Sequence, residues 1–515
     1  MSARLRSLPT DGQTIDVAHR EGGNALTTFW VDRNLGFAVA AGVAAMFALL
    51  SAWLTPRGPI TTSEALATVI AALVVGVLCG LFTGSRWSLL FAPVIFLALF
   101  ELARAGVSGP TVDSIHLGSL YGAIAFVVGR VVHGLLTLLP MVLGALVGVG
   151  LAGRWGNGTA RPFGLGSWLL TTLLALLLIV IFVAIAQPAR TAPILGTDGA
   201  PLPGSIAELT TVTLGGHEQA LMLRGRSTDN PVLLYLAGGP GGTDLGAMRL
   251  DTGLEQRFVV VTWDQRGAGK SYPALDPTAT LTLDQMVADT VELTHYLRDR
   301  FDEEKIYLVG QSWGSTLGVL AAQAHPELYH AFVGVGQMVS QRETDRLFYE
   351  DTLAWAEQNG NEALVAQLQA QGPPPYGNLL DYEPALSHEH DWNAYPEFNV
   401  ENEMPAILFV PEYTWLERIN GFRSFLDTFS VLYPQLQGID FRADVARLDV
   451  PFYMVLGEHE ARGRAVLAEE WFQMVDAPSK EQITFEGAGH RPNFDRPSEF
   501  AALMTRVVEE TGAKQ

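Results

Sequence analysis

Gly310-Gln311-Ser312-Trp313-Gly314 is the stretch that decides the fold of this 515-residue chain. The pentad directly follows the apolar run 306–309 and opens a run of small and apolar residues, 315–322. A buried strand that passes into a helix through a glycine-flanked serine is a nucleophile elbow, in which a strained turn lifts the hydroxyl above the sheet edge. Side chains at the two glycine positions would clash in such a turn. The pentad therefore predicts an α/β sheet that presents Ser312 as a nucleophile.

The chain on both sides of the pentad alternates strand-like and helix-like patterns. Helical periodicity lies between most of the strand-like runs, which are found at 207–214, 217–224, 231–236, 258–263, 305–309, 331–335, 451–456 and 482–485. This order predicts a mostly parallel, doubly wound sheet whose site gathers at the carboxyl ends of the strands. The helical, aromatic segment 340–440 interrupts the alternation. We therefore predict an α/β core in two parts, 206–339 and 441–515, with 340–440 as an inserted helical cap.

Charge divides the molecule into two halves. Residues 1–195 hold 11 Arg, no Lys and 7 acidic residues, whereas the remainder holds 22 basic and 47 acidic residues and has a net charge of −25. Such acidity argues against a nucleic-acid partner, because phosphate binding needs a basic face. The single Cys79 permits no intrachain disulfide.

The first half is dominated by apolar stretches. They run at about 37–54, 66–83, 87–103, 119–153 and 167–187, and a helix that spans a bilayer needs about 20 apolar residues. The fourth stretch contains Arg130 and His133, so we interpret it as an interfacial start before a span at 131–153. The sequence thus predicts a transmembrane region at 36–187 with about five helices, embedded in a lipid bilayer, and a proline-rich linker at 188–205.

The arginines predict how this region is oriented. If residues 1–35 form a cytoplasmic segment, seven arginines face the cytoplasm and three face the other side. The cytoplasmic set is Arg4, Arg6, Arg20, Arg33, Arg86, Arg154 and Arg161, and the opposite set is Arg57, Arg104 and Arg190. An odd number of spans then places the second half outside the cytoplasm.

Two strand ends downstream of Ser312 carry the polar residues that a serine nucleophile needs. A serine hydroxyl requires a base, and the base must be oriented by a third group; in this architecture the chain order is Ser, acid, His. His490 follows the small turn 486–489 and is the predicted general base. Glu460 is the predicted acid, with Glu458 as the runner-up. His459 is a rival base, but it lies where the acid belongs.

A glycine-rich loop, 237–242, follows an earlier predicted strand. Backbone N–H groups of Gly238 and Gly239, with that of Trp313, are the predicted oxyanion donors. The loop is not a phosphate cradle, because no Gly-Lys-Ser/Thr follows it. We predict no cofactor and no metal, since the His388–Asp391 cluster lacks helical i,i+4 spacing and a further ligand.

Three segments together resemble the proline iminopeptidase (prolyl aminopeptidase) branch of the α/β hydrolases. They are 239–241, Asp264–Ser271 and 310–317 within a resemblance that covers about 205–512. The resemblance implies a serine exopeptidase that releases an N-terminal residue, typically Pro, from short peptides through an acyl-enzyme on Ser312. It also implies that Glu460 stands where the family usually has Asp, and that Arg266 braces loops near the site. The family often has His where this chain has Ala237.

Members of that family hold the substrate's amino group with carboxylates of the cap. Glu343 and Glu350 are the first candidates for this clamp, and Trp392 is a candidate lining of an apolar pocket; the alternatives are a solvated helix face and the cap's own core. Further candidate carboxylates of the cap are Asp345, Asp351, Glu401 and Glu403. Two other functions stay open: an esterase or lipase-like hydrolase of small or membrane-derived esters, and an idle module that only binds a ligand. The sequence gives no oligomeric state.

Overall fold

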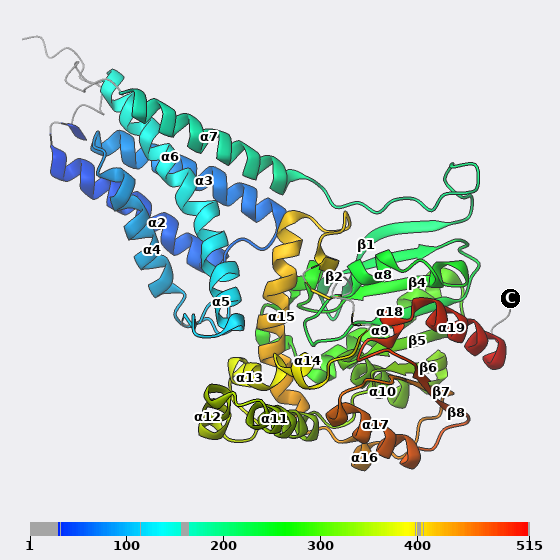
Figure 1. Cartoon of the computed structure of the whole chain (residues 1–515). Helices are drawn as coiled ribbons and strands as arrows, with labels where there is room; N and C mark the ends of the chain where they lie inside the picture. Colours follow the sequence, from blue (N-terminus) through cyan, green and yellow to red (C-terminus); the bar gives the residue numbers. More distant parts are fainter. Residues whose placement is uncertain are drawn as a thin grey trace, which may run out of the picture.

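The computed structural model describes residues 29–512 apart from 31, 114, 156–163, 397, 399–402 and 405. A bundle of long helices stands at one end of an α/β domain, and the chain passes from one to the other once, after α7 (Figure 1). Most of the predicted cytoplasmic segment 1–35 lies outside the described residues, as does Arg161. Its placement, and the side of the membrane on which the α/β domain lies, stay predictions.

Four helical segments of the N-terminal region are long and apolar enough to cross a membrane. They are α2 (Arg33–Leu54), α3 (Thr62–Thr83), the continuous run of α5 (Leu120–Phe126), π-helical η1 (Val127–Val131) and α6 (Val132–Trp155), and α7 (Leu165–Ala186). The predicted third span, α4 (Ser88–Ala103), has only 16 residues, or about 24 Å at 1.5 Å per residue. The predicted region of about five helices thus contains four helices of spanning length and the shorter apolar helix α4, and the number that cross a membrane stays a prediction.

The fourth span is part of a longer helical run. Residues 120–155 form one run of 36 residues in which α6 begins at Val132, and the interfacial start before 131–153 stays a prediction. Small residues let this run pack closely on α3: a Cβ on Gly76 would come within 2.0 Å of the Met141 carbonyl oxygen, and one on Gly144 within 2.1 Å of that of Leu73. Close backbone approach of this kind is how helices associate in lipid, where apolar side chains give no net advantage.

The α/β domain contains one eight-stranded sheet. Its strands are β1 (Ile206–Leu214), β2 (His217–Gly225), β3 (Val232–Leu236), β4 (Val259–Asp264), β5 (Ile306–Gln311), β6 (Tyr329–Val335), β7 (Phe452–Gly457) and β8 (Lys480–Phe485). They lie in the order β1-β2-β4-β3-β5-β6-β7-β8, with the β1–β2 and β2–β4 pairs antiparallel and the others parallel. All eight predicted strands are confirmed, with ends that differ by at most two residues.

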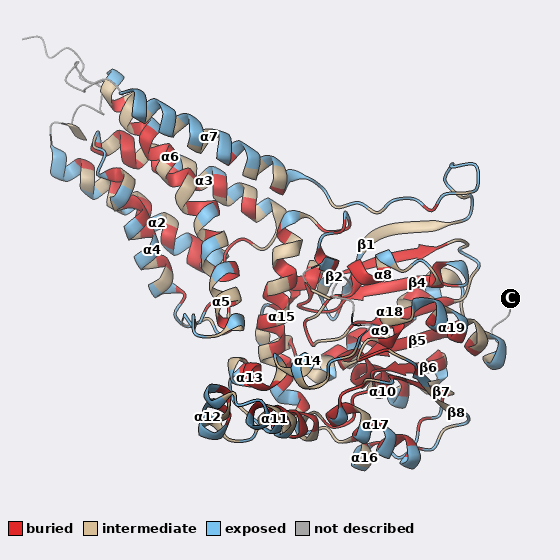
Figure 2. Ribbon diagram, viewed as in Figure 1, coloured by how far each residue is buried: buried red, intermediate tan, exposed pale blue. Residues whose placement is uncertain are grey.

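Helices cover both faces of this sheet and create two separate cores. One core includes side chains of α9 (Leu283–Phe301), α10 (Trp313–Ala324) and α17 (Arg462–Met474); the other includes those of α8 (Leu245–Leu250) and α19 (Pro497–Thr511). The central strands are buried throughout, as Figure 2 shows. A parallel sheet buried on both faces explains why these strands read as continuous apolar runs.

The segment between β6 and β7 is helical, in agreement with the predicted cap. It contains α11 (Gln341–Gln358), α12 (Glu362–Gln371), η6 (Leu379–Tyr382), α13 (Glu383–Leu386), α14 (Glu389–Trp392), η8 (Ala406–Leu408) and α15 (Trp415–Leu436). The long helix α15 stands between the helical bundle and the sheet (Figure 1). It therefore contacts both halves of the molecule.

Buried polar contacts join α15 to the loops of the bundle. Asp427 accepts hydrogen bonds from Arg57 Nη1 at 2.9 Å and from the Thr111 backbone N–H at 3.0 Å. Arg423 donates to the carbonyl oxygens of Pro59 and Val128. Because the Arg57 and Asp427 side chains are 3% and 1% exposed, this junction is part of the packed interior and not a flexible tether.

Candidate active site

Ser312 has a strained backbone conformation at the carboxyl end of β5. Its φ of 54° and ψ of −121° lie in a region that non-glycine residues avoid. A Cβ on Gly310 would lie 2.2 Å from the Gly314 carbonyl oxygen, and one on Gly314 would lie 2.1 Å from that of Leu236. Only glycine fits at both positions, so the turn is the elbow that the pentad predicts.

The structure brings Ser312, His490 and Glu460 into one hydrogen-bonded chain. His490 Nε2 lies 2.9 Å from Ser312 Oγ, and His490 Nδ1 lies 2.8 Å from Glu460 Oε2. The three residues follow β5, β8 and β7, respectively. Parallel strands end at a common edge of the sheet, which is why residues up to 178 positions apart in sequence meet here.

Glu460 is the carboxylate that contacts the imidazole. Its Oε1 accepts hydrogen bonds from Arg464 Nε at 2.7 Å and from the Ala461 N–H at 3.0 Å, which leaves Oε2 for His490. Burial alone would raise the pKa of Glu460, but the charges and hydrogen bonds of Arg464 and His490 outweigh it and lower the pKa to about 2. Glu460 is therefore an ionised acceptor at neutral pH.

Glu458, the runner-up, has a different position. Its side chain is exposed, and Oε2 accepts a hydrogen bond from the Gly487 N–H at 2.8 Å. It thus holds the turn that leads to His490 instead of contacting the imidazole. The loop after β7 continues for two residues before it turns back, so the later carboxylate reaches the histidine.

The glycine-rich loop lies directly beside the nucleophile. A Cβ on Gly238 would come within 3.3 Å of Ser312 Cβ, and Gly239 has a φ of 131° that other residues rarely adopt. Gln265 braces this arrangement: its Nε2 donates to the Ala237 carbonyl oxygen at 3.1 Å, and its Oε1 accepts from Trp313 Nε1 at 2.9 Å. Trp313 is the first residue of α10, where backbone N–H groups have no partner within the helix.

The segment Asp264–Ser271 supports the same loop, although not through Arg266. Buried Asp264 accepts hydrogen bonds from Thr243, just after the glycine-rich loop, and from Lys270 N at 2.8 Å; burial raises its pKa to about 6. Arg266 instead pairs with Asp289 of α9 at 2.7 Å and donates to the Leu214 carbonyl oxygen. The implied role of Arg266 near the site is therefore corrected to a brace of the β1–β2 turn.

The cap helix α15 completes the support. Thr428 Oγ1 donates to the Gly267 carbonyl oxygen at 2.7 Å, and Ser424 Oγ accepts from the Gly269 N–H at 3.1 Å. A Cβ on Gly241 would lie 2.3 Å from the Ser424 carbonyl oxygen. The loops beside Ser312 thus rest on the helix that the membrane-side loops hold at Asp427.

The three candidate substrate contacts have other partners. Glu343 and Glu350 both pair with Arg346 on α11, and their side chains are 34% and 45% exposed. Trp392 packs edge-on against Phe348 and donates to Thr352 Oγ1 at 3.0 Å. These contacts match the alternatives, a solvated helix face and the cap's own core.

Another of the candidate carboxylates of the cap, Glu403, approaches the site. Glu403 Oε2 lies 3.4 Å from Nη1 of Arg491, which directly follows His490, and Arg491 also pairs with Asp244 at 2.6 Å. Burial raises the pKa of Glu403. Sequence reasoning did not name Arg464, Gln265 or Arg491 as site residues. Arg464 lies in no local motif, whereas Gln265 lies within the segment Asp264–Ser271 and Arg491 lies next to His490, and both positions were usable signals.

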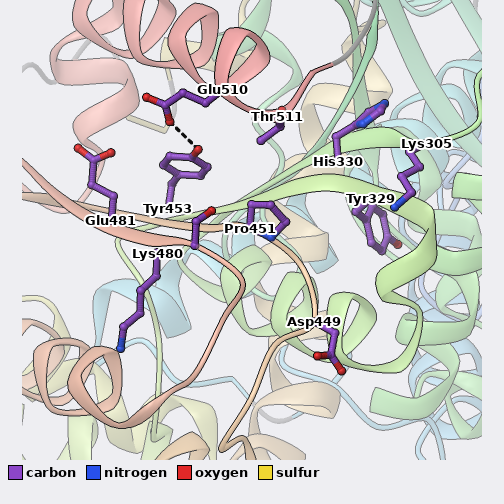
Figure 3. A pocket seen from close by; sticks show the side chains of 11 residues that line it. Lys305, Tyr329, His330, Asp449, Pro451, Tyr453, Lys480, Glu481, Glu510 and Thr511 are labelled. Atoms are coloured by element: carbon purple, nitrogen blue, oxygen red, sulfur yellow. Dashed lines mark hydrogen bonds between the residues drawn. The ribbon is translucent and has the colours of Figure 1, made fainter.

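A separate cavity of about 570 Å³ opens at the opposite edge of the sheet. Figure 3 shows its lining, which comes from the residues before or at the start of β5 to β8 and from the end of α19: Lys305, Tyr329, His330, Asp449, Pro451, Tyr453, Lys480, Glu481, Glu510 and Thr511. The strand β5 separates Lys305 from Ser312 by about 23 Å at about 3.3 Å per residue. Sheets of this type bind ligands at their carboxyl edge, so the cavity is not part of the site at Ser312.

Comparisons with known proteins agree with this architecture. The chain matches the sequence pattern of the family described as alpha/beta hydrolase fold over residues 231–497. It is 29% identical over 317 residues to a probable aminopeptidase YbaC of Bacillus subtilis, which covers 59% of this chain and 96% of that protein. It is also 32% identical to a probable proline iminopeptidase of Leptolyngbya boryana, over 25% of this chain and 39% of that protein.

Solved structures are similar to part of this chain. The crystal structure of a proline iminopeptidase of Mycobacterium smegmatis covers 59% of this chain and 98% of its own, with 17% identity and a TM-score of 0.44. The eight-stranded sheet, the elbow at Ser312 and the match over 231–497 lead to one assignment. The chain belongs to the α/β hydrolase fold family.

Proposed function

We propose that the protein is a membrane-anchored serine aminopeptidase that works through an acyl-enzyme on Ser312. The observation that carries the proposal is the unbroken contact from Ser312 Oγ through His490 to Glu460, with the serine held in a strained turn. Strain at a functional residue persists only where the surrounding structure imposes it. A hydrolase of this fold requires the same three roles of nucleophile, base and acid.

The chemistry follows from the positions of the polar atoms. His490 Nε2 takes the proton of Ser312 Oγ as the oxygen attacks the carbonyl carbon, and the negative charge that develops on the carbonyl oxygen is stabilised by backbone N–H groups at Gly239 and Trp313. The imidazolium then gives the proton to the leaving amine, and the acyl group stays on Ser312. Water, deprotonated by His490, releases the acyl group.

The aminopeptidase class is proposed because the relatives carry that name and because the cap offers a carboxylate near the base. Glu403 pairs with Arg491, the residue that follows His490. A free α-ammonium group of a peptide would compete with Arg491 for this carboxylate and would fix the first residue beside Ser312. The acidic charge of the second half also favours a cationic substrate over an anionic one.

The proposed location is the membrane, with the hydrolase domain outside the cytoplasm. The four helices of spanning length support the membrane location, and the side rests on the arginine distribution with the shorter helix α4 counted as the fifth span. The loops that hold α15 lie on the same side of the bundle as the hydrolase domain, since Arg57 and Thr111 both contact Asp427.

The test compares two substrate classes with full-length protein in detergent. We expect turnover of Pro-, Ala- or Leu-arylamides that Ser312→Ala abolishes, and covalent labelling of Ser312 by a fluorophosphonate. Glu403→Gln should raise KM for arylamides with a free amino group and leave turnover of a p-nitrophenyl ester unchanged. Ester turnover without arylamide turnover would instead establish an esterase, and no turnover with no labelling would establish an idle binding module.

A further inference from the structure

A pocket of about 480 Å³ lies where the last apolar helix of the bundle ends. One wall comes from the residues just after α7 and the other from the segment that leads into α15; together they are Gln187, Pro188, Arg190, Phe409, Pro411, Tyr413, Thr414, Trp415 and Arg418. The Arg190 backbone N–H donates to the Pro411 carbonyl oxygen at 3.0 Å. Leu416 is 1% exposed and belongs to the same apolar cluster as Leu178 and Ile185 of α7. The pocket is therefore fixed to the end of the helix.

This position corresponds to the head-group layer of a bilayer. The helix α7 has 22 residues, an 18-residue window of which has a mean hydropathy of 3.1, and it is the least buried of the four long helices (Figure 2). A helix of that length fills the hydrocarbon core, so residues directly after Ala186 lie at the membrane–water boundary. Phe409 and Trp415 are 58% and 44% exposed beside them, and aromatic side chains concentrate at this depth.

The pocket carries two arginines that have no ion pair in the part of the chain that the structure describes. The Arg418 guanidinium lies over the Trp415 ring at 4.5 Å and over the Phe409 ring at 5.5 Å. Its Nη2 donates to the Val410 carbonyl oxygen, whereas its buried Nε has no hydrogen-bond partner among the described residues. The Arg190 side chain is exposed. Guanidinium groups held flat on aromatic rings retain donors for an oxyanion.

The neighbouring carboxylates are already committed to other cations. Glu412 pairs with Arg249 at 2.8 Å, and Glu417 pairs with Lys270 at 2.7 Å. The pocket therefore keeps a net positive charge next to apolar rings. A free phosphate would use the charge but not the exposed rings, and a zwitterionic head group would bring its own cation against the two arginines.

We propose that this pocket binds the phosphate of an anionic phospholipid, with Arg190 and Arg418 as its donors and with Phe409 and Trp415 against the glycerol and upper acyl chain. The proposal rests on insertion of α7 in the bilayer and not on the peptidase activity. It gives the helical bundle a role beyond anchoring, because the bound lipid would bridge α7 to the segment that begins α15.

The test measures lipid retained by the full-length protein. Protein in a mild detergent is supplied with phosphatidylglycerol or phosphatidylcholine, and bound lipid is counted by native mass spectrometry. We expect retention of phosphatidylglycerol and a loss of at least about tenfold in Arg190→Gln/Arg418→Gln, since hydrogen bonds to charged groups each contribute roughly this factor. Arg190→Lys/Arg418→Lys should keep part of the binding. The charge-matched control Arg257→Gln/Arg447→Gln, at exposed positions before β4 and β7, should bind as the wild type does.

Three results would overturn the proposal: equal retention of both lipids, equal retention by the Gln variants and the control, or displacement of phosphatidylglycerol by millimolar inorganic phosphate, which would identify a free-anion site. Thermal unfolding of every variant identifies a variant that fails to fold. If the Gln double variant does not fold, the lipid retention of Arg190→Lys/Arg418→Lys tests the proposal in its place. Arylamide turnover by the same samples separates the two proposals, because lipid retention without turnover would refute only the peptidase.

Discussion

Arg464→Met tests whether Glu460 works as an ionised acceptor. Arg464 Nε donates to Glu460 Oε1 at 2.7 Å, and the pair is almost fully buried. A hydrogen bond to a charged group contributes about 1.5–3 kcal/mol, and about 1.4 kcal/mol corresponds to a factor of ten in rate. If this contact orients Glu460 for His490, the substitution should lower kcat/KM about 10- to 100-fold. Methionine keeps the apolar stem beside Phe348, over which the guanidinium now lies at 4.8 Å.

The pH profile distinguishes this role from a loss of packing. With Arg464 present, the pKa of Glu460 is lowered from 4.5 to about 2, so its ionisation stabilises the fold above pH about 4.5, and that stabilisation is lost as the pH falls towards about 2. Without Arg464, burial still acts on the carboxyl group and its pKa rises. We expect the acid limb of kcat/KM to move to higher pH, and Arg464→Lys to restore part of the activity.

The matched control is Arg462→Met on the same helix. Arg462 pairs with Asp351 at 2.7 Å and is 49% exposed, so its loss should leave both the rate and the pH profile close to those of the wild type. The assay is hydrolysis of the best arylamide or ester substrate between pH 4 and 9, with thermal unfolding in parallel. An unchanged acid limb in Arg464→Met, or the same loss in Arg462→Met, would refute the reasoning.

Two further predictions concern the acid and the junction. Glu460→Gln should reduce kcat roughly 10⁴-fold, as expected when the group that orients the base is lost. Glu458→Gln should keep a rate near that of the wild type in the same assay. A large loss in Glu458→Gln with little loss in Glu460→Gln would show that Glu458 is the acid. Arg57→Met should destabilise the protein by about 3–5 kcal/mol, because it leaves Asp427 buried without its cation, and Arg57→Met/Asp427→Leu should recover part of this loss in urea unfolding in detergent. A single-variant loss of under about 1 kcal/mol, as for an exposed pair, would contradict the buried junction.

The agreement between sequence and structure is strongest where the signal is local. The pentad at 310–314 predicts its own conformation, because a glycine-flanked serine between an apolar run and a run of small residues is typical of a strained elbow. The clash that excludes a side chain at Gly310 is local, whereas the one at Gly314 is with Leu236 of β3. The strands are likewise visible as apolar runs, since both faces of the sheet are covered. The apolar stretch predicted at 87–103 agrees with α4 (Ser88–Ala103) to within one residue, because Arg86 and Arg104 bound the apolar run.

The candidate contacts to substrate, in contrast, could not be predicted from local sequence. Acidic residues at 343 and 350 resemble a clamp in sequence, yet their partner Arg346 lies on the same helix face. The carboxylate that does approach the site, Glu403, is placed by contacts with Arg491, 88 residues away. Arg464 is similarly tied to both Glu460 and Glu389 of the cap. Such ion pairs depend on how separate elements pack, and the periodicity of the sequence does not predict them.

The sequence by itself determined the elbow at Ser312, the order of nucleophile, acid and base, and the division into an apolar helical half and an acidic α/β half. These features depend on local sterics, strand periodicity and composition, which a linear chain displays. Only the tertiary structure decided that Glu460 and not Glu458 contacts His490. It also decided that the loops of the bundle bind α15, the helix that contacts the loops beside Ser312. The physical reason is that hydrogen bonds are satisfied over a few ångströms in space, whereas the residues that make them lie tens to hundreds of positions apart in the chain.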